Sequence, residues 1–479
     1  MLDNSLIRDP GARERISCEE LSILAGRRSS AAPSYLIGIA DTESRGAYFR
    51  LRHNEFVDRQ ALFSRSDVDE IDEDPRTVVL VATNPDGRVV GGVRLAPVTT
   101  EDLGWWAGSR LVVQAGQSHR TGTALVRAAC AYVESAGVLR FDATVQDRYA
   151  AMFCSLGWHD RGAGPVISRR AHRRMTWPIG TVQRLTDSTK SLLADVLTPF
   201  GGHELGLGPQ GFRGDDGVPV PGSDLVAACD AVIPSMVERD PEWAGWCSIL
   251  VNINDLSAMG AVPVGALDAV GAPTRSQLSR IVRGVAAAAA AWRVPVLGGH
   301  TQLSVPASLS VTALGRTASP VPAGGGQVGH TVSLITDVGG SWRRGYAGRQ
   351  WDSTSVRSAD ELAQLASVVG DLQPAAAKDV SMAGIVGTLG MLAEASGVGA
   401  EIDVAAVPKP AGADVGSWLT CFPGYGMLVA DSEAVRSVVG PATAAPCGTL
   451  TSGSGVRLLW PDGETTVAVG STVTGLGRA

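Results

Sequence analysis

The chain has 479 residues, of which 44% are apolar and 19% charged, and 41 basic residues against 48 acidic ones leave a net charge of −7. This composition supplies enough apolar material for packed cores and excludes a wholly disordered chain. The length predicts about three domains. The acidic excess lies in residues 181–479, whose net charge is −8. An acidic half argues against a nucleic-acid binding surface and is compatible with sites where carboxylates hold divalent cations.

No membrane span is expected, because no run of residues approaches 18 apolar positions. The amino terminus lacks the apolar segment of a signal peptide. The seven cysteines are scattered and never form a C-x-x-C pair, which is typical of thiols in a reducing compartment. We therefore expect a cytoplasmic protein with no membrane partner.

The first part of the chain predicts a mixture of strands and helices after a polar leader. Apolar and polar residues alternate from Tyr48 to Val57, and Asn84–Gly87 reads as a hairpin turn. The leader and the expected elements, in chain order, are a leader 1–34, hairpin strands 77–82 and 89–95, a strand 111–113, a helix 125–136, a strand 141–145 and a short helix 149–156.

Two segments are interpreted as linkers between domains. The arginine-rich run 169–174 is expected to be solvated, and 320–326 is rich in Pro and Gly. The resulting domains are 35–180, 181–320 and 327–479. One helix is expected over 182–197, and the later helices are expected at 359–369 and 381–395.

A glycine turn in the first domain is a candidate anion site. Gly122 lies between the strand 111–113 and an amphipathic helix. A helix amino terminus presents free N–H groups and a partial positive charge, which suit a pyrophosphate. Glu55, Glu101 and Asp102 are candidate general bases, and each is equally explained as a surface carboxylate; Glu55 is the one that we retain.

This order of elements resembles that of the GNAT acetyltransferases, as do the turn His119–Ala124 and the segment Gln146–Trp158. The amino-acid sequence of the region resembles their nitrogen-starvation branch. The resemblance implies a GNAT fold, acetyl-CoA as cofactor and an amine as acyl acceptor. The residues that it places at the cofactor are Leu111, Val113, His119, Arg120, Thr121, Gly122, Thr123 and Ala124.

One departure from that family concerns acid catalysis. Phe153 stands where many members have the tyrosine that protonates the departing CoA thiolate, and Phe has no proton to give. Two alternatives therefore stay open for this domain: an N-acyltransferase, or an acyl-CoA-binding sensor that regulates the rest of the chain.

Acidic residues are conspicuous after residue 200. Asp215 and Asp216 follow a Gly-rich stretch, and Asp255 follows an apolar run that we interpret as a buried strand. Such carboxylates are the ligands that Mg²⁺ uses beside nucleotide phosphates. The alternatives are a simple turn for Gly-Asp-Asp-Gly and a helix N-cap for Asp255.

Three motifs in this region, Gly214–Val218, Asn254–Pro263 and Gly298–Thr301, together resemble the amino-terminal half of the AIR synthase superfamily. The resemblance implies a two-domain ATP-binding fold of α/β and α+β type and a homodimer formed through the 181–320 domain. It places Asp215, Asp216 and Asp255 at Mg²⁺ and makes the following residues nucleotide contacts: Gly298, Gly299, His300 and Thr301.

The segment Lys378–Ile385, which opens a helix, resembles the second-domain signature of the same superfamily. Lys378 then becomes a phosphate contact and Asp379 a metal or substrate contact, both counted as catalytic candidates. A helix cap beside an exposed lysine is the alternative. Together the resemblances predict a bifunctional enzyme that joins an acyl-CoA-dependent N-acyltransferase to a Mg-ATP-dependent kinase-like or amide-activating unit, acting on a small nitrogenous metabolite.

Overall fold

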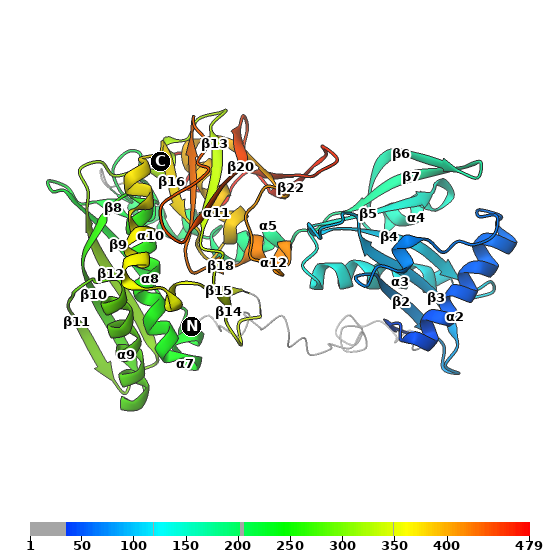
Figure 1. Cartoon of the computed structure of the whole chain (residues 1–479), viewed down its shortest axis with the longest axis horizontal. Helices are drawn as coiled ribbons and strands as arrows, with labels where there is room; N and C mark the ends of the chain where they lie inside the picture. The colour runs from blue at the N-terminus through cyan, green and yellow to red at the C-terminus, as the bar shows by residue number, and fades with distance from the viewer. Residues whose placement is uncertain (1–34, 118, 202–205, 348) are drawn as a thin grey trace. The chain divides into compact units, whose positions relative to one another are not determined.

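The structure is a computed structural model that describes residues 35–479 except 118, 202–205 and 348, so the expected leader 1–34 lies outside the described residues. The chain divides into two compact units, Met1–Ile179 and Gly180–Ala479 (Figure 1). Within the described residues, no helix combines the length and the apolarity needed to cross a membrane.

The first unit is built on a seven-stranded sheet of order β1-β2-β3-β4-β5-β7-β6, in which only the β4–β5 pair is parallel. Its elements are β1 Leu36–Ile39, α2 Thr42–Arg52, the π-helix η2 His53–Arg59, the 3₁₀ helix η3 Glu70–Asp72, β2 Val78–Thr83, β3 Val89–Pro97, β4 Trp105–Val113, α3 His119–Ser135, β5 Arg140–Gln146, α4 Asp147–Ser155, β6 His159–Ile167 and β7 Arg170–Trp177.

Helices cover both faces of this sheet. Successive side chains of a strand point to opposite faces, and Leu80 of β2 shares a hydrophobic cluster with Leu125 of α3, whereas the neighbouring Val81 shares one with Tyr48 of α2. The alternation from Tyr48 onward is therefore helical and not extended. Tyr48 and Arg52 are both buried at an i, i+4 spacing, which is the period of one helix face.

The first unit also buries a network of ion pairs. Arg52 lies 2.6 Å from Asp67 and 2.7 Å from Asp72, and Arg94 lies 2.8 Å from Asp72. Burial opposes the ionisation of Asp72, but the hydrogen bonds and charges of Arg52 and Arg94 outweigh it and lower its pKa to about 2. Asp72 therefore stays ionised, because Arg52 and Arg94 are its cationic partners.

The arginine-rich run 169–174 was expected to be a linker, and that expectation is wrong. Most of it forms β7, which pairs with both β5 and β6, and His172 is buried. Arg173 pairs with Asp160 across the hairpin at 2.5 Å. The charged residues suggested a linker because a strand that is paired on both sides can still hold arginines that reach solvent, as the half-buried Arg173 and the exposed Arg174 do.

The second unit contains sheets of five, seven and three strands. Its elements up to residue 325 are α5 Thr181–Thr189, α6 Leu193–Leu197, η4 Thr198–Phe200, β8 Val218–Pro219, β9 Leu225–Ala231, α7 Pro234–Arg239, α8 Pro241–Ala258, β10 Val262–Ala272, α9 Arg275–Ala291, β11 Val296–Leu303, β12 Ser308–Arg316 and η5 Ala323–Gly325.

The remaining elements are β13 Thr331–Thr336, β14 Ser341–Trp342, β15 Gln350–Asp352, η6 Thr354–Val356, α10 Ala359–Leu372, β16 Ala376–Asp379, α11 Gly384–Ser396, β17 Gly399–Asp403, α12 Val415–Thr420, β18 Phe422–Pro423, β19 Gly426–Asp431, β20 Thr443–Thr451, β21 Val456–Leu459 and β22 Thr465–Val469.

The centre of the second unit is the helix α8, which is buried on nearly every side. It packs against the five-stranded sheet, α9, α10 and β16. Its crossing with α9 requires glycine, because a Cβ on Gly284 would lie 1.9 Å from the carbonyl oxygen of Glu242. The apolar run before Asp255 was interpreted as a strand, which is wrong. A helix buried all round has no polar face, so its sequence looks like a buried strand.

The two large sheets of this unit share one core. Ile335 and Met427 of the seven-stranded sheet belong to the same hydrophobic cluster as Leu256 of α8 and Leu365 of α10. The segment 320–326, interpreted as a linker, includes buried residues and η5. It is held to the surrounding structure by hydrogen bonds and is therefore not a free connection.

The first residues of the expected 181–320 domain differ from the prediction in their helices and in their packing. The residues 182–197 form two helices, α5 and α6, and α5 packs against α11 and β22 of the seven-stranded sheet. The Gln183 side chain accepts a hydrogen bond from the Gly470 N–H at 2.6 Å. This helix pair therefore belongs by packing with the end of the chain.

The five-stranded sheet, of order β11-β10-β12-β9-β8, is covered on one side by α8 and α9 (Figure 1). Its strands β10 and β11 expose the side chains of Val262, Leu267, Val296, Leu297 and Leu303. The edge strand β11 pairs only with β10 and is exposed along its whole length. A long apolar edge of this kind is a surface on which another chain can pair.

Candidate functional site

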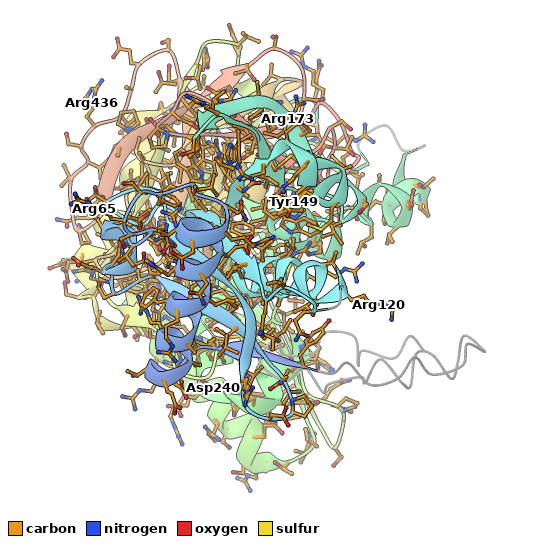
Figure 2. All side chains as sticks on the ribbon, turned by 90° about the vertical axis from the view of Figure 1, so that its right-hand side faces the viewer. Arg65, Arg120, Tyr149, Arg173, Asp240 and Arg436 are labelled. Atoms are coloured by element: carbon orange, nitrogen blue, oxygen red, sulfur yellow. The ribbon has the colours of Figure 1, made fainter. Side chains whose placement is uncertain are left out.

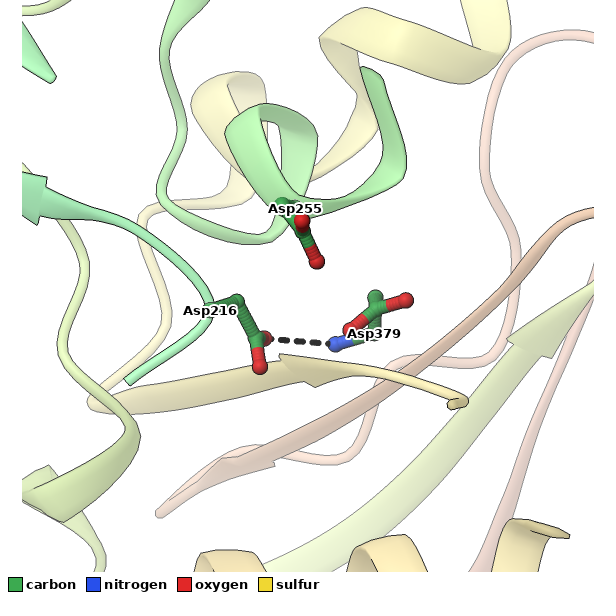
Figure 3. A group of neighbouring side chains, drawn as sticks. All are labelled: Asp216, Asp255 and Asp379. Atoms are coloured by element: carbon green, nitrogen blue, oxygen red, sulfur yellow. Dashed lines mark hydrogen bonds between the residues drawn. The ribbon is translucent and has the colours of Figure 1, made fainter. Parts of the chain in front are cut away.

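Three aspartates from distant parts of the sequence meet in the second unit (Figure 3). Asp216 lies in the loop before β8, Asp255 in the last turn of α8, and Asp379 at the end of β16. One carboxylate oxygen from each lies within 4.8 Å of the other two. We call these residues the acidic trio.

The fold determines this meeting because α8 packs directly against β16. Next to Asp255, the Asn254 Nδ2 donates to the carbonyl oxygen of Gly424 at 3.2 Å, which attaches the end of α8 to the second half of the unit. Asp255 and Asp379 are only 6% and 3% exposed. Their carboxylates accordingly lie inside the protein rather than on a solvated surface.

The partners of the three carboxylates differ. Asp216 accepts a hydrogen bond from the Asp379 N–H at 2.9 Å, the contact drawn in Figure 3, and forms an ion pair with Lys378. Within the described part of the chain, the side chains of Asp255 and Asp379 have no hydrogen-bond or ion-pair partner. Buried carboxylates without partners are unfavourable unless a cation joins them. Carboxylate oxygens are among the ligands that Mg²⁺ uses in proteins.

Burial and mutual repulsion control the charge of the trio. Burial, followed by the charges of Asp379 and Asp230, raises the pKa of Asp255 well above its usual value. Burial and the charge of Asp216 raise the pKa of Asp379 in the same way, with Lys378 opposing. Burial also disfavours the charged form of Lys378, but Asp216 and Asp215 outweigh it and raise its pKa. Lys378 is therefore a fixed ammonium beside carboxyls that bind protons readily.

Asp215 was expected to bind the metal together with Asp216 and Asp255, but it lies outside the trio. Its Oδ2 accepts a hydrogen bond from the Ala323 N–H at 2.7 Å, and its Oδ1 lies 3.8 Å from Lys378. Burial raises its pKa to about 6, although Lys378 pulls it down. Asp215 therefore attaches the Gly-rich loop to η5, and Asp379 takes the third place in the trio.

Two charged residues near the trio were missed in the sequence. Asp230, on β9, is close enough for its charge to raise the pKa of Asp255 and Asp379. Lys190, at the end of α5, acts in the opposite direction on Asp230 and Asp379. Neither belongs to a short motif. The scarcity of lysine, at only three positions in the chain, was the one signal that pointed to Lys190.

The expected nucleotide contacts, Gly298–Thr301, do not belong to the acidic trio. They form part of the exposed edge strand β11, not the end of a buried strand, and His300 is outside the trio. Gly299 lies directly against Asp268 of β10, because a Cβ there would be 1.8 Å from the Asp268 Oδ1. The small residues in this motif therefore allow two strands to approach closely.

The Gly-rich stretch before the trio lines a cavity of about 470 Å³. Asp215 lies at its wall, and most of the remaining lining is apolar, including Leu207, Phe212 and Val218. A cavity with mainly apolar walls and a few polar groups is typical of a small-molecule site.

In the first unit, β4 and β5 are paired only at Trp105–Gly108 and Arg140–Ala143. Leu111 and Val113 lie beyond the stretch that pairs with β5, before the turn that begins α3, although Val113 is paired with Gly91 of β3 on the other side of the strand. Gly122 has room around it, since a Cβ there would meet only Val113 at 3.6 Å. Thr121 is fully buried, and its hydroxyl has no hydrogen-bond partner among the residues that the structure describes.

The catalytic candidates of the first unit are placed less favourably. Burial favours a higher pKa for Glu55, but hydrogen bonds from Arg59, at 2.6 Å, and from Gln60 outweigh it and lower the pKa. A low pKa is the opposite of what a general base for an amine needs. Phe153 is buried in an edge-on contact with Trp158. The tyrosine of α4 is Tyr149, one turn earlier and exposed (Figure 2).

Comparisons with known proteins match the second unit. Residues 214–317 match the AIR synthase related protein, N-terminal domain, and residues 352–461 match the AIR synthase related protein, C-terminal domain. The chain is 38% identical over 223 residues to an uncharacterised protein of Synechocystis sp., covering 45% of this chain and 69% of that protein.

Two more distant matches are to thiamine-monophosphate kinases. The chain is 34% identical over 117 residues to the enzyme of Synechococcus elongatus, covering 22% of this chain and 36% of that protein. A solved structure of thiamine monophosphate kinase from Aquifex aeolicus has a TM-score of 0.40 and 21% identity, and covers 53% of this chain and 92% of that one. Likeness at this level of structure has no bearing on function.

The raised pKa values predict how cation binding depends on pH. Mg²⁺ ligands must be deprotonated, and Asp255 and Asp379 hold protons to a higher pH than ordinary carboxyls. Protons therefore compete with the cation at low pH and are released when it binds. We expect Mg²⁺ to bind more tightly at pH 8 than at pH 6, with more protons released at pH 6. Titration calorimetry in two buffers of different ionisation enthalpy measures this release, and no release at either pH contradicts the prediction.

Proposed function

Because the second unit makes this chain a member of the AIR synthase-related family, we propose that this unit binds Mg-ATP and transfers a phosphoryl group to a small nitrogenous molecule. The observation that supports the proposal most directly is the acidic trio: two of its carboxylates are buried without a partner among the described residues, and a buried lysine lies beside them. The activation of an amide oxygen by ATP, as in an amide-forming ligase, is the second chemistry compatible with the same site.

Each part of the site has a distinct role in this proposal. Asp216, Asp255 and Asp379 hold the Mg²⁺, which neutralises the charge of the phosphates when it is bound. Lys378 contacts a phosphate oxygen as a point charge. Asp215 holds the Gly-rich loop in place through Ala323, so that the loop's backbone lies beside the nucleotide. The apolar cavity next to this loop accommodates the uncharged part of a ligand.

The first test of this proposal is the substitution Asp255→Asn. Loss of even an outer partner of a metal site costs about 10–100-fold in affinity, so loss of a direct ligand is expected to weaken Mg-ATP binding at least about tenfold. Calorimetric titration measures the affinity, and phosphorus NMR with a panel of small amines, amides and thiamine monophosphate detects ADP and any phosphorylated product.

The matched control is Asp268→Asn. Asp268 is also partly buried in the five-stranded sheet and has a raised pKa, because burial disfavours its charge, but it lies outside the trio. Its substitution is expected to leave Mg-ATP affinity within about twofold. Unchanged affinity and unchanged Mg²⁺ dependence in Asp255→Asn would remove the trio from the mechanism.

For the first unit we propose acyl-CoA binding, with transfer of the acyl group to an amine. The proposal is supported by the ends of β4 and β5, which do not pair with each other, and by the glycine turn that opens α3. The side of β4 that faces β5 is unpaired beyond Gly108, so the backbone near Leu111 and Val113 can pair there with an extended ligand, while its other side pairs with β3. The start of α3, from His119 to Ala124, suits a pyrophosphate. The buried Phe153 and the low pKa of Glu55 favour the alternative, an acyl-CoA sensor that regulates the second unit.

Acetyl-CoA titration of Gly122→Asp and Gly122→Ala tests the turn. An added Cβ has room at Gly122. A carboxylate beside the pyrophosphate is expected to weaken binding at least about tenfold, while alanine changes it by less than about threefold. Equal affinities in the two variants would exclude the turn as the binding site. Release of CoA with an amine panel distinguishes the transferase from the sensor, which binds without turnover.

We also propose a homodimer formed through the exposed apolar side of β10 and β11. Leu297, on the edge strand, is 58% exposed and lies among other exposed aliphatic side chains. Such a patch on a long unprotected edge is unfavourable in water unless a second chain covers it.

Light scattering of Leu297→Arg tests the dimer. A charge at the centre of an apolar interface is expected to shift the protein to monomer at micromolar concentration. Val439→Arg is the matched control, because Val439 is 76% exposed and outside this sheet, and its substitution is expected to leave the dimer intact. A wild-type protein that is monomeric at all concentrations rejects the proposal.

A further inference from the structure

Lys378 places a fixed positive charge inside the proposed cation site. It lies on β16, is 5% exposed, and forms an ion pair with Asp216, a member of the acidic trio. Its Nζ also lies 3.8 Å from the Asp215 Oδ1. A buried ammonium in contact with one of three cation ligands takes up part of the space that a metal ion would fill. It also neutralises part of the negative charge that would attract the metal ion.

The trio is therefore unequal before any metal binds. Both oxygens of Asp216 already have partners: the Oδ1 contacts Lys378, and the Oδ2 accepts the hydrogen bond from the Asp379 N–H. The side chains of Asp255 and Asp379 have none within the described residues. One ligand is held by a resident cation, while the other two are ready for a divalent ion.

We propose that Lys378 competes with the divalent cation for Asp216, and that the phosphates of the nucleotide remove this competition by taking the Lys378 ammonium. Two cations on one carboxylate repel each other, which weakens metal binding to the nucleotide-free protein. A polyphosphate supplies new acceptors for the ammonium, and the flexible four-carbon stem of lysine allows it to turn toward them. Asp215, which is held by the Ala323 N–H, keeps Lys378 near the site through their ion pair, both before and after the nucleotide binds.

The consequence is a positive coupling between the metal and the nucleotide. Each ligand increases the affinity of the other by the same factor, because linkage is reciprocal. The inference rests on the metal site of the proposed function and adds to it an order of events: metal alone binds weakly, and metal with nucleotide binds tightly.

The experiment titrates Mn²⁺ into the full chain, with and without a non-hydrolysable ATP analogue, and follows bound Mn²⁺ by electron paramagnetic resonance. In the wild type, we expect the analogue to tighten Mn²⁺ binding at least about tenfold. In Lys378→Met, we expect Mn²⁺ alone to bind at least about tenfold tighter than in the wild type, and the analogue to add less than about threefold. Lys378→Arg keeps the positive charge and is expected to keep Mn²⁺ binding weak.

Three outcomes overturn the inference, and two of them leave the metal site itself intact. The wild type binding Mn²⁺ equally well with and without the analogue overturns it without any variant, so a poorly folding Lys378→Met protein does not prevent the test. The inference is also overturned if Lys378→Met binds Mn²⁺ no tighter than the wild type while Asp255→Asn still weakens Mn²⁺ binding. If Asp255→Asn also binds Mn²⁺ like the wild type, the metal site fails, and the inference fails with it.

Discussion

Carboxylates buried close together repel each other and lose their hydration, and the second unit is organised around this cost at the acidic trio. Asp216, Asp255 and Asp379 come from a loop, a helix end and a strand end. They meet only when α8 is packed against β16, since that contact brings the two large sheets into one core. The apolar burial of α8 thus stabilises an arrangement that electrostatics alone would disperse. Lys378 offsets part of the repulsion, and a divalent cation is the natural means of offsetting the rest.

In the first unit, unlike at the acidic trio, each buried carboxylate contacts an arginine. Arg52 and Arg94 lie in direct contact with the aspartates of their network, and the pKa of Asp72 falls. In the second unit burial, followed by the charges of neighbouring carboxylates, raises the pKa of Asp255 and of Asp379, and neither side chain has a direct cationic partner among the described residues. Paired buried charges are typical of a structural network, whereas unpaired ones are typical of binding or catalytic sites. This contrast within one chain distinguishes the scaffold from the site.

Sequence reasoning predicted much of the local structure, where the signal is local. The hairpin around Asn84–Gly87, the strand that became β5 and the helices that became α4, α10 and α11 were all expected. It failed where tertiary context overrides the local pattern. The helix α8 was taken for a strand because it is buried all round. The run 169–174 was taken for a linker because it is rich in charge, although the strand β7 that it forms keeps its arginines half-buried or exposed.

The sequence by itself determined which residue types are available and in which motifs: the aspartates at 215, 216, 255 and 379, and the lysine at 378. Only the tertiary structure decided how they are used. It separated Asp215 from the trio, put Asp379 in its place, brought Lys190 and Asp230 near, and left Gly298–Thr301 on an exposed edge. The physical reason is that charge, burial and ligand distance depend on packing between segments more than a hundred residues apart, and no local motif encodes that packing.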